Sequence, residues 1–166
     1  PAGGETRMAT VLVDLAVHEQ STISAPTLTA REDSLERLLE SVDVHAGRSW
    51  GLICAGSLPQ GLAEDSYAHL IRRGRTCGLT TLLDTSGAAL RLGVRAVPHI
   101  VKINVHELQA LGGGERTLAV PGEDLQLTPD ALIALRQALA DRLGEWASEA
   151  IVITLGERGA LAVAAG

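Results

Sequence analysis

The sequence predicts an α/β fold in which a mostly parallel sheet is flanked by helices on both faces. Short apolar runs typical of buried strands alternate along the chain with segments that repeat leucine at helical spacing. This alternation is the pattern of parallel strands joined by crossover helices. The chain has 166 residues, enough for one domain with a core, and its 46% apolar content excludes a disordered chain.

In the first part of the chain, residues 9–15 are apolar and β-branched enough for a strand. Residues 29–32 have the spacing of a capping box at the start of a helix. Residues 50–55 form a near-continuous apolar run, typical of a strand buried on both faces. The next helix is expected to end at Gly74, after two arginines in its last turn. The buried faces of these two helices would carry Leu35, Leu38, Leu39 and Val42, and Tyr67, Leu70 and Ile71.

The middle of the chain continues the alternation of strands and helices. Residues 79–83 and 97–103 are expected to be strands, and residues 88–92 a short helical turn between them. A further helix over 107–111 is expected to end at the run of glycines that begins with Gly112. The stretch 115–126 is polar, contains Gly and Pro, and is predicted to be a loop.

The last part of the chain begins with a strong helix-start signal. Residues 128–130, Thr-Pro-Asp, have the identities of an N-cap, a first-position proline and a first-turn acid. This helix is expected to end at Gly144, with a buried face of Leu132, Leu135, Leu139 and Leu143. Residues 150–155 form a last buried strand, and residues 160–163 are predicted to pair with it as a hairpin.

Four short polar motifs follow the predicted strands in a fixed order. They are GSLPQG at 56–61, DTSG at 84–87, KINVHE at 102–107 and TLGERG at 154–159. The carboxyl ends of the strands form the ligand crevice of an open α/β sheet. The four motifs therefore predict a dispersed binding site that carries glycine, hydroxyl, cation and carboxylate groups.

Each motif also has a purely structural interpretation. The first is a tight connection rich in glycine, and the last fits a hairpin turn. Asp84 could cap the following turn or contribute to the crevice, while Asn104 and Glu107 have the spacing of a capping box. Lys102 is harder to explain structurally, because it is a cation at the end of an apolar run. A lysine, an amide and a carboxylate at one strand end suit phosphates and a hydrated Mg²⁺.

In this order and spacing, the four motifs resemble the ribokinase-like carbohydrate kinases of the phosphofructokinase B type. Residues 4–7 and 22–26 resemble the preceding segments of the branch that acts on phosphorylated hexoses, which includes 1-phosphofructokinase and tagatose-6-phosphate kinase. The resemblance implies ATP and Mg²⁺ as cofactors and a sugar phosphate as the substrate. The expected activity of the intact protein is phosphorylation of fructose 1-phosphate, fructose 6-phosphate or tagatose 6-phosphate.

The resemblance also assigns roles to matching residues. It implies that Arg7 and Ser57 bind the sugar phosphate and that Glu107 is tied to Mg²⁺. The residues implied to bind the nucleotide are Lys102, Asn104, Thr154, Gly156 and Gly159. Two positions depart from the family pattern: Ile103 stands where a proline is usual, and Thr27 where a glycine is usual.

The resemblance further implies that residues 1–166 are the central part of a single kinase domain. The amino-terminal part of the family's domain and its carboxy-terminal glycine-alanine-glycine-aspartate region, with the general-base aspartate, have no counterpart in this sequence. We therefore expect the chain alone to be inactive. The alternative is a truncated or degenerate module that binds nucleotide or a partner without catalysis. A dehydrogenase domain is disfavoured, because no G-x-G-x-x-G follows a strand.

Composition limits the partners and the setting. A formal net charge of −6 argues against nucleic acid as the main partner. The longest apolar stretches are too short to span a membrane. Cys54 and Cys77 have no zinc-binding spacing and predict a reducing, cytoplasmic setting. A homodimer is left open, because the dimerising lid strands of the family lie partly outside the sequence.

Overall fold

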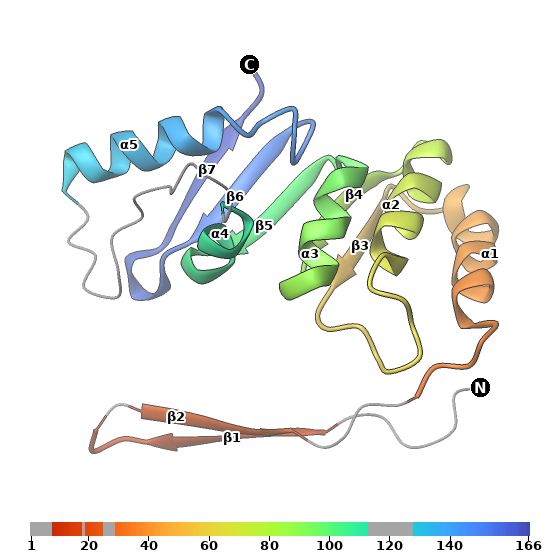
Figure 1. Cartoon of the computed structure of the whole chain (residues 1–166), viewed down its shortest axis with the longest axis horizontal. Coiled ribbons are helices and arrows are strands. Elements are labelled where there is room, and N and C mark those ends of the chain that lie inside the picture. The colour runs from red at the N-terminus through yellow and green to blue at the C-terminus, as the bar shows by residue number, and fades with distance from the viewer. Residues whose placement is uncertain (1–7, 18, 25–28, 113–127) are drawn as a thin grey trace.

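The computed structural model describes residues 8–17, 19–24, 29–112 and 128–166. Its centre is a five-stranded sheet in the order β3-β4-β5-β6-β7 (Figure 1). The first four strands are parallel, and β7 is antiparallel to β6. The strands are β3 (Gly51–Ala55), β4 (Thr80–Asp84), β5 (Ile100–Asn104), β6 (Ala150–Thr154) and β7 (Ala160–Ala164). The predicted α/β class and mostly parallel sheet are confirmed, as is the hairpin of β6 and β7.

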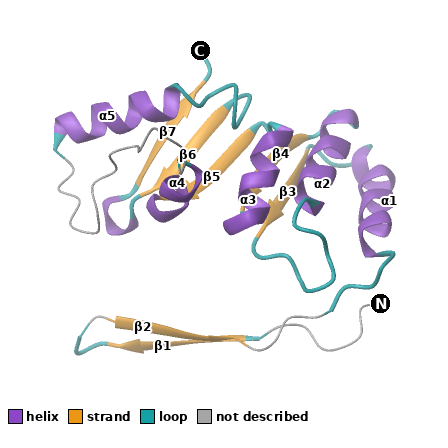
Figure 2. Cartoon of the chain, viewed as in Figure 1, coloured by secondary structure: helices purple, strands orange, loops and turns teal. Residues whose placement is uncertain are grey.

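Helices alternate with the parallel strands along the chain, and Figure 2 distinguishes helices from strands by colour. They are α1 (Ser34–Ala46), α2 (Ser66–Thr76), α3 (Gly87–Gly93), α4 (Val105–Leu111) and α5 (Pro129–Ala140), with 3₁₀ turns η1 (Val94–Ala96) and η2 (Gly156–Arg158). The helical turn predicted at 88–92 lies within α3. The predicted start of α5 is confirmed, since Thr128 Oγ1 accepts the Ala131 N–H at 3.2 Å. None of the described helices is long and apolar enough to cross a bilayer.

The core lies between one face of the sheet and the helices. On this face every strand contributes side chains, and Leu83, Val101, Ile103, Ile151 and Ile153 are fully buried. They share the core with Ile71 of α2, Leu90 of α3, Leu108 of α4 and Leu139 of α5, each at most 1% exposed. Burial of these apolar side chains removes them from water and stabilises the packing of the helices on the sheet.

The opposite face of the sheet has a different character. It carries the alternate residues of each strand, and among the described residues none of these side chains is buried. Ile53 of β3 is 65% exposed there. Residues 160, 162 and 164 of β7 add three exposed alanines. Parallel sheets normally have both faces covered. The sequence predicts a layer of helices on each face, and the described residues supply the layer on one face.

A second sheet consists of β1 (Ala9–Asp14) and β2 (Glu19–Ser24), paired antiparallel. Figure 1 shows this hairpin standing apart from the five-stranded sheet. Its apolar side chains are exposed, among them Val13 at 59% and Leu15 at 81%. The strand predicted at 9–15 is confirmed, whereas β2 was not predicted, because its sequence EQSTIS lacks an apolar pattern.

Several predicted boundaries are wrong. The capping box at 29–32 does not start α1, because Ser34 and Arg31 close a tight turn through two hydrogen bonds, and Thr29 pairs with Gln60 instead. The strand predicted from Val97 begins at Ile100, because Val97 has a left-handed φ of 48°. The last helix ends at Ala140, before Gly144.

Gly74 does not end α2 as predicted. It lies inside the helix, which continues to Thr76. A Cβ at Gly74 would lie 2.9 Å from Leu52 Cδ2 and 3.0 Å from Thr81 Cγ2, so glycine permits close packing of α2 on the sheet. The loop predicted at 115–126 lies outside the described residues.

Candidate functional site

Three of the four polar motifs come together at the carboxyl ends of neighbouring strands. Asp84, Asn104 and Thr154 are the last residues of β4, β5 and β6. Asn104 lies directly opposite Thr154 in the ladder. Lys102 lies two residues before Asn104, so the alternation of strand side chains places it on the same half-exposed face. The fold therefore gathers a cation, a carboxylate, an amide and a hydroxyl along one edge.

Lys102 forms an ion pair with Asp84. Its Nζ lies 3.0 Å from Asp84 Oδ1, and the two side chains are 34% and 37% exposed. Lys102 is also the single lysine of the whole sequence, beside thirteen arginines. Of the two roles open for Asp84, the geometry favours the crevice, because the N-cap position of α3 is occupied by Ser86. The ion pair holds the ammonium of Lys102 at the strand ends.

Asn104 and Glu107 form the capping box that their spacing predicts. Asn104 Oδ1 accepts the Glu107 N–H at 2.9 Å, and Glu107 Oε2 accepts the Asn104 N–H at 2.8 Å. The box positions α4, whose Leu108 is fully buried. Both side chains are half-buried, so the same groups that cap the helix also border the crevice.

The turn after β3 is tied to the end of β4. Gly56 has φ +80°, and its N–H donates to Asp84 O at 2.9 Å. Thr85, 4% exposed, donates its hydroxyl to Gly56 O at 2.7 Å. These bonds hold the turn that contains Ser57 at the carboxyl ends of the strands. Ser57 follows β3, and β4 lies between β3 and the strand β5 that carries Lys102. Thr85 was not singled out in the sequence, because its contact depends on the pairing of β3 and β4.

The motif at 154–159 is the hairpin connection of β6 and β7. Gly156 and Gly159 have φ of +65° and +88° and flank η2. A Cβ at either position would meet nothing within 4 Å, so backbone conformation explains these glycines. The hairpin turn by itself therefore explains why these two positions are glycine. Thr154, the last residue of β6, is the residue of this motif whose side chain lies on the half-exposed face of the sheet.

The structure describes only some of the remaining positions that the sequence singled out. Arg7 and Thr27 lie outside the described residues. Ile103, which departs from the family pattern, is fully buried in the core of β5. Within the described part of the chain, no three His, Cys, Asp or Glu residues gather to hold a metal ion. A hydrated Mg²⁺ that takes one or two carboxylates together with substrate phosphates is compatible with Glu107, since it needs no such cluster.

Comparisons with known proteins find similar sugar-phosphate kinases. No protein-family profile matches the chain. A 1-phosphofructokinase from Xanthomonas campestris is 32% identical over 164 residues, which are 96% of this chain and 47% of the relative. A 1-phosphofructokinase from Rhodobacter capsulatus is 33% identical over 138 residues, 80% of this chain and 43% of the relative.

The chain is similar to about half of a ribokinase-like carbohydrate kinase of the phosphofructokinase B type.

Solved structures give the same assignment. Escherichia coli phosphofructokinase-2 in complex with fructose-6-phosphate matches with a TM-score of 0.69 and 25% identity, covering 95% of this chain and 48% of that one. A possible 1-phosphofructokinase from Thermotoga maritima shares the fold, with a TM-score of 0.70 and 20% identity over 97% of this chain and 47% of its own. The chain thus spans about half the length of the relatives that it matches.

Proposed function

We propose that the complete protein to which these residues belong transfers the γ-phosphoryl group of ATP to a hydroxyl of a phosphorylated hexose. The observation that carries this proposal is the cluster of Lys102, Asp84, Asn104 and Thr154 at adjacent strand ends. The names of the matching 1-phosphofructokinases support the same class of reaction. Fructose 1-phosphate, fructose 6-phosphate and tagatose 6-phosphate are the candidate acceptors.

On the nucleotide side, Lys102 would contact the phosphates, since its ammonium already lies at the strand ends. Asp84 would keep that ammonium in place through the 3.0 Å contact until the phosphates replace it as the partner. Asn104, Thr154, Gly156 and Gly159 would border the nucleotide.

Glu107 would hold Mg²⁺ through the carboxylate that also caps α4. When bound, Mg²⁺ offsets charge on the phosphates during transfer.

On the sugar side, Ser57 would bind the hexose phosphate from the turn after β3, together with Arg7. In this proposal residues 1–166 are the central part of one kinase domain. The family's general-base aspartate has no counterpart in the sequence, and such a base is worth about 10²–10⁴-fold in rate. We therefore expect the chain alone to release no ADP with any of the three sugar phosphates in a coupled assay. Substantial turnover would contradict this expectation.

Nucleotide binding is testable on the chain itself, because Lys102 is its single lysine. Trinitrobenzenesulfonate modifies amines, and mass spectrometry separates Lys102 from the amino terminus. We expect a non-hydrolysable ATP analogue with Mg²⁺ to slow modification of Lys102 several-fold. Calorimetry should detect binding of the analogue, and Lys102→Met should weaken it. Arg48→Gln is the control, because it also removes one positive charge but lies just before the amino end of β3, away from the strand-end site; it should leave binding unchanged. Equal modification rates with and without the analogue would contradict the assignment.

The second candidate function is a nucleotide-binding or interaction module without catalysis. The half-exposed face of the sheet favours it, because an uncovered apolar face promotes association. A homodimer through the exposed hairpin of β1 and β2 is part of this candidate. Sedimentation equilibrium should then report twice the 17.3 kDa chain mass, and Val13→Lys, on β1, should restore the monomer. A monomer at all accessible concentrations would argue against the dimer.

A further inference from the structure

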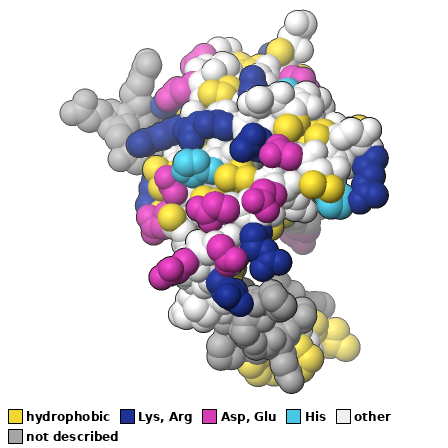
Figure 3. All heavy atoms as spheres, turned by 90° about the vertical axis from the view of Figure 1, so that its right-hand side faces the viewer, with side chains coloured by type: hydrophobic (Ala, Val, Ile, Leu, Met, Phe, Trp, Pro, Cys, Tyr) yellow, Lys and Arg dark blue, Asp and Glu magenta, His cyan; other side chains and the backbone are white. Residues whose placement is uncertain are grey.

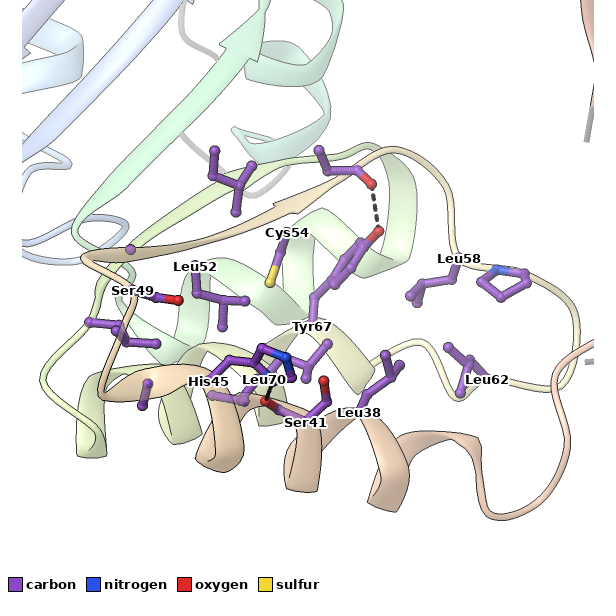
Figure 4. Close-up of a pocket in the computed structure, with 17 residues that line it drawn as sticks. Leu38, Ser41, His45, Ser49, Leu52, Cys54, Leu58, Leu62, Tyr67 and Leu70 are labelled. Carbon is purple, nitrogen blue, oxygen red and sulfur yellow. Dashed lines mark hydrogen bonds between the residues drawn. The ribbon is translucent and has the colours of Figure 1, made fainter. Parts of the chain in front are cut away.

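The carbonyl of Gly56, in the turn that carries Ser57, accepts hydrogen bonds from two side-chain hydroxyls. Thr85, which directly follows β4, donates to Gly56 O at 2.7 Å, and Tyr67 of α2 donates to it at 3.2 Å. Tyr67 also donates to Ala55 O at 2.8 Å, and Figure 4 shows its side chain reaching from α2 to the end of β3. Since a carbonyl oxygen has two lone pairs, the two hydroxyls use the full acceptor capacity of Gly56 O.

Together with one backbone bond, these contacts hold both peptide groups that flank Gly56. The Gly56 N–H donates to Asp84 O at 2.9 Å, so the peptide before Gly56 is tied at its nitrogen to β4 and at its carbonyl to Tyr67. The peptide after Gly56 is tied through its own carbonyl. Gly56 has φ +80°, in the region that glycine adopts without steric cost. Because glycine is the most permissive residue, the conformation at Gly56 depends on these hydrogen bonds.

The orientation of the second peptide group determines how the chain enters Ser57. Every described peptide bond is trans, so the carbonyl and the N–H of one peptide group point in opposite directions. With the Gly56 carbonyl directed at the hydroxyls of Thr85 and Tyr67, the Ser57 N–H is directed away from them. Rotation of this peptide group would turn the Ser57 N–H and redirect the side chain that follows it.

The far end of the same turn is fixed as well. Gln60 O accepts the Ala30 N–H at 2.7 Å, and Gln60 forms an isolated parallel bridge with Thr29. Ser57 therefore lies between two anchored points of the backbone. The anchor next to it is the Gly56 carbonyl, which depends on side chains from two other elements.

The surroundings of the two hydroxyls suit this bonding role. Thr85 is 4% exposed, and Tyr67 is half-buried. A buried hydroxyl costs free energy unless it is hydrogen-bonded, and valine or phenylalanine would fill nearly the same volumes without that cost. Burial raises the pKa of Tyr67, with a further contribution from Cys54, so the phenol keeps its proton and stays a donor. The carbonyls that they bond therefore explain why both side chains carry hydroxyls.

We propose that Thr85 and Tyr67 are positioning residues, which fix the peptide group between Gly56 and Ser57 so that Ser57 meets the phosphorylated hexose in one orientation. Neither side chain needs to touch the ligand. The proposal rests on the proposed function, because that function gives Ser57 its ligand. It adds two residues, beyond Arg7 and Ser57, on which the affinity for the sugar phosphate depends.

The first measurement tests the effect of each hydroxyl on the peptide group in the 166-residue chain. NMR observes the carbonyl carbon of Gly56 through the Ser57 amide, and loss of a hydrogen-bond donor moves this resonance upfield. Thr85→Val and Tyr67→Phe each remove one hydroxyl with little change of shape, and both should shift the resonance. Thr85→Ser keeps the hydroxyl and should leave it near the wild-type position. An unshifted Gly56 resonance in the folded valine and phenylalanine variants would overturn the proposal.

The second measurement follows binding of fructose 1-phosphate, fructose 6-phosphate and tagatose 6-phosphate through the Ser57 amide resonance. We expect one of them to bind the wild-type chain. Thr85→Val and Tyr67→Phe should each weaken its binding about fivefold, the factor that one ordinary hydrogen bond is worth. Thr85→Ser should restore it. Undiminished binding by the valine and phenylalanine variants, despite shifted Gly56 resonances, would contradict the positioning role.

Two controls separate this binding from other attraction of phosphate and from loss of nucleotide binding. Figure 3 shows basic side chains exposed on the face of the molecule beside α1, and such groups attract phosphate without selecting a sugar. Inorganic phosphate is therefore titrated in parallel, and it should bind more weakly than the sugar phosphate. A non-hydrolysable ATP analogue with Mg²⁺ should bind Thr85→Val as tightly as the wild-type chain.

Thr81→Val is the matched variant. Thr81 of β4 is fully buried like Thr85, but its hydroxyl lies 3.0 Å from His99 Nδ1, near the amino end of the strand. Its loss should lower stability and leave binding of both ligands unchanged. An equal loss of sugar-phosphate binding in Thr81→Val, or an equal loss of both ligands in Thr85→Val, would show a general loss of structure and overturn the proposal.

Failure of the proposed function gives a different result from failure of the positioning role. If phosphoryl transfer is the wrong assignment, the ATP analogue does not protect Lys102, while the Ser57 amide still responds to the sugar phosphate. Thr81→Val then still separates positioning from stability. A wild-type chain whose Ser57 amide responds to none of the sugar phosphates would overturn the positioning role, even where the analogue protects Lys102.

Discussion

Replacement of Asn104 by alanine tests whether the capping box is what holds the strand-end site in shape. The substitution removes the acceptor of the 2.9 Å bond from Glu107 N–H and leaves that half-buried donor without its partner. Loss of an N-cap typically costs about 1 kcal/mol, within about 0.5–2. Because α4 has seven residues and carries the fully buried Leu108, we expect the upper half of that range, about 1–2 kcal/mol.

The assay is urea unfolding followed by circular dichroism. With a slope of about 2 kcal/mol per molar urea, the middle of the usual range, the midpoint should fall by about 0.5–1 M. Asn104→Asp keeps an acceptor oxygen and should cost at most a few tenths of a kcal/mol, since Asp and Asn cap about equally well. Thr128→Ala is the control, because it removes a comparable cap from α5, away from the site. Its cost should be about 0.5–1 kcal/mol.

A double-mutant cycle tests the reciprocity of the box. Glu107→Ala removes the 2.8 Å bond to Asn104 N–H, and the two single variants should be non-additive by about 0.5–1 kcal/mol. Strict additivity, or an unchanged midpoint in Asn104→Ala, would refute the capping argument. A loss of nucleotide binding in Asn104→Asp at full stability would show a ligand role beyond the cap.

Three further predictions concern the stability of the buried part of the structure. Gly93→Ala should destabilise by about 1–2 kcal/mol in urea, since a Cβ would lie 2.7 Å from the buried Leu83 Cδ2, whereas Gly47→Ala meets nothing within 4 Å and should be neutral. His99→Ala should cost about 1–3 kcal/mol, because the ring Nδ1 accepts a buried backbone N–H of β4 at 2.9 Å; an unchanged urea midpoint would contradict this. Burial raises the pKa of Cys54 to about 11 from 9.0, so the folded state keeps its proton where the unfolded state loses it. The free energy of unfolding should therefore fall by about 2 kcal/mol from pH 8 to pH 10.5 because of this thiol. The difference in urea midpoint between wild type and Cys54→Ala at these two pH values measures the loss.

Local signals explain what could be predicted of the fold. The apolar runs of β3 to β6, the Thr128 cap and the spacing of Asn104 and Glu107 all act within a few residues, and the structure has each of them. The errors arise where a distant contact overrides a local preference. Gly74 would end an isolated helix, but its place over Leu52 and Thr81 makes it an interior packing residue.

The sequence by itself determined the order of strands and helices and the position of each polar motif at a strand end, because periodicity, caps and turns are local. Only the tertiary structure decided that Lys102 meets Asp84, eighteen residues away, since that contact depends on the pairing of β4 with β5. It also decided that one face of the sheet and the edge of β3 stay uncovered among the described residues. Pairing and layer packing join distant segments, and a periodic pattern does not specify which segments meet.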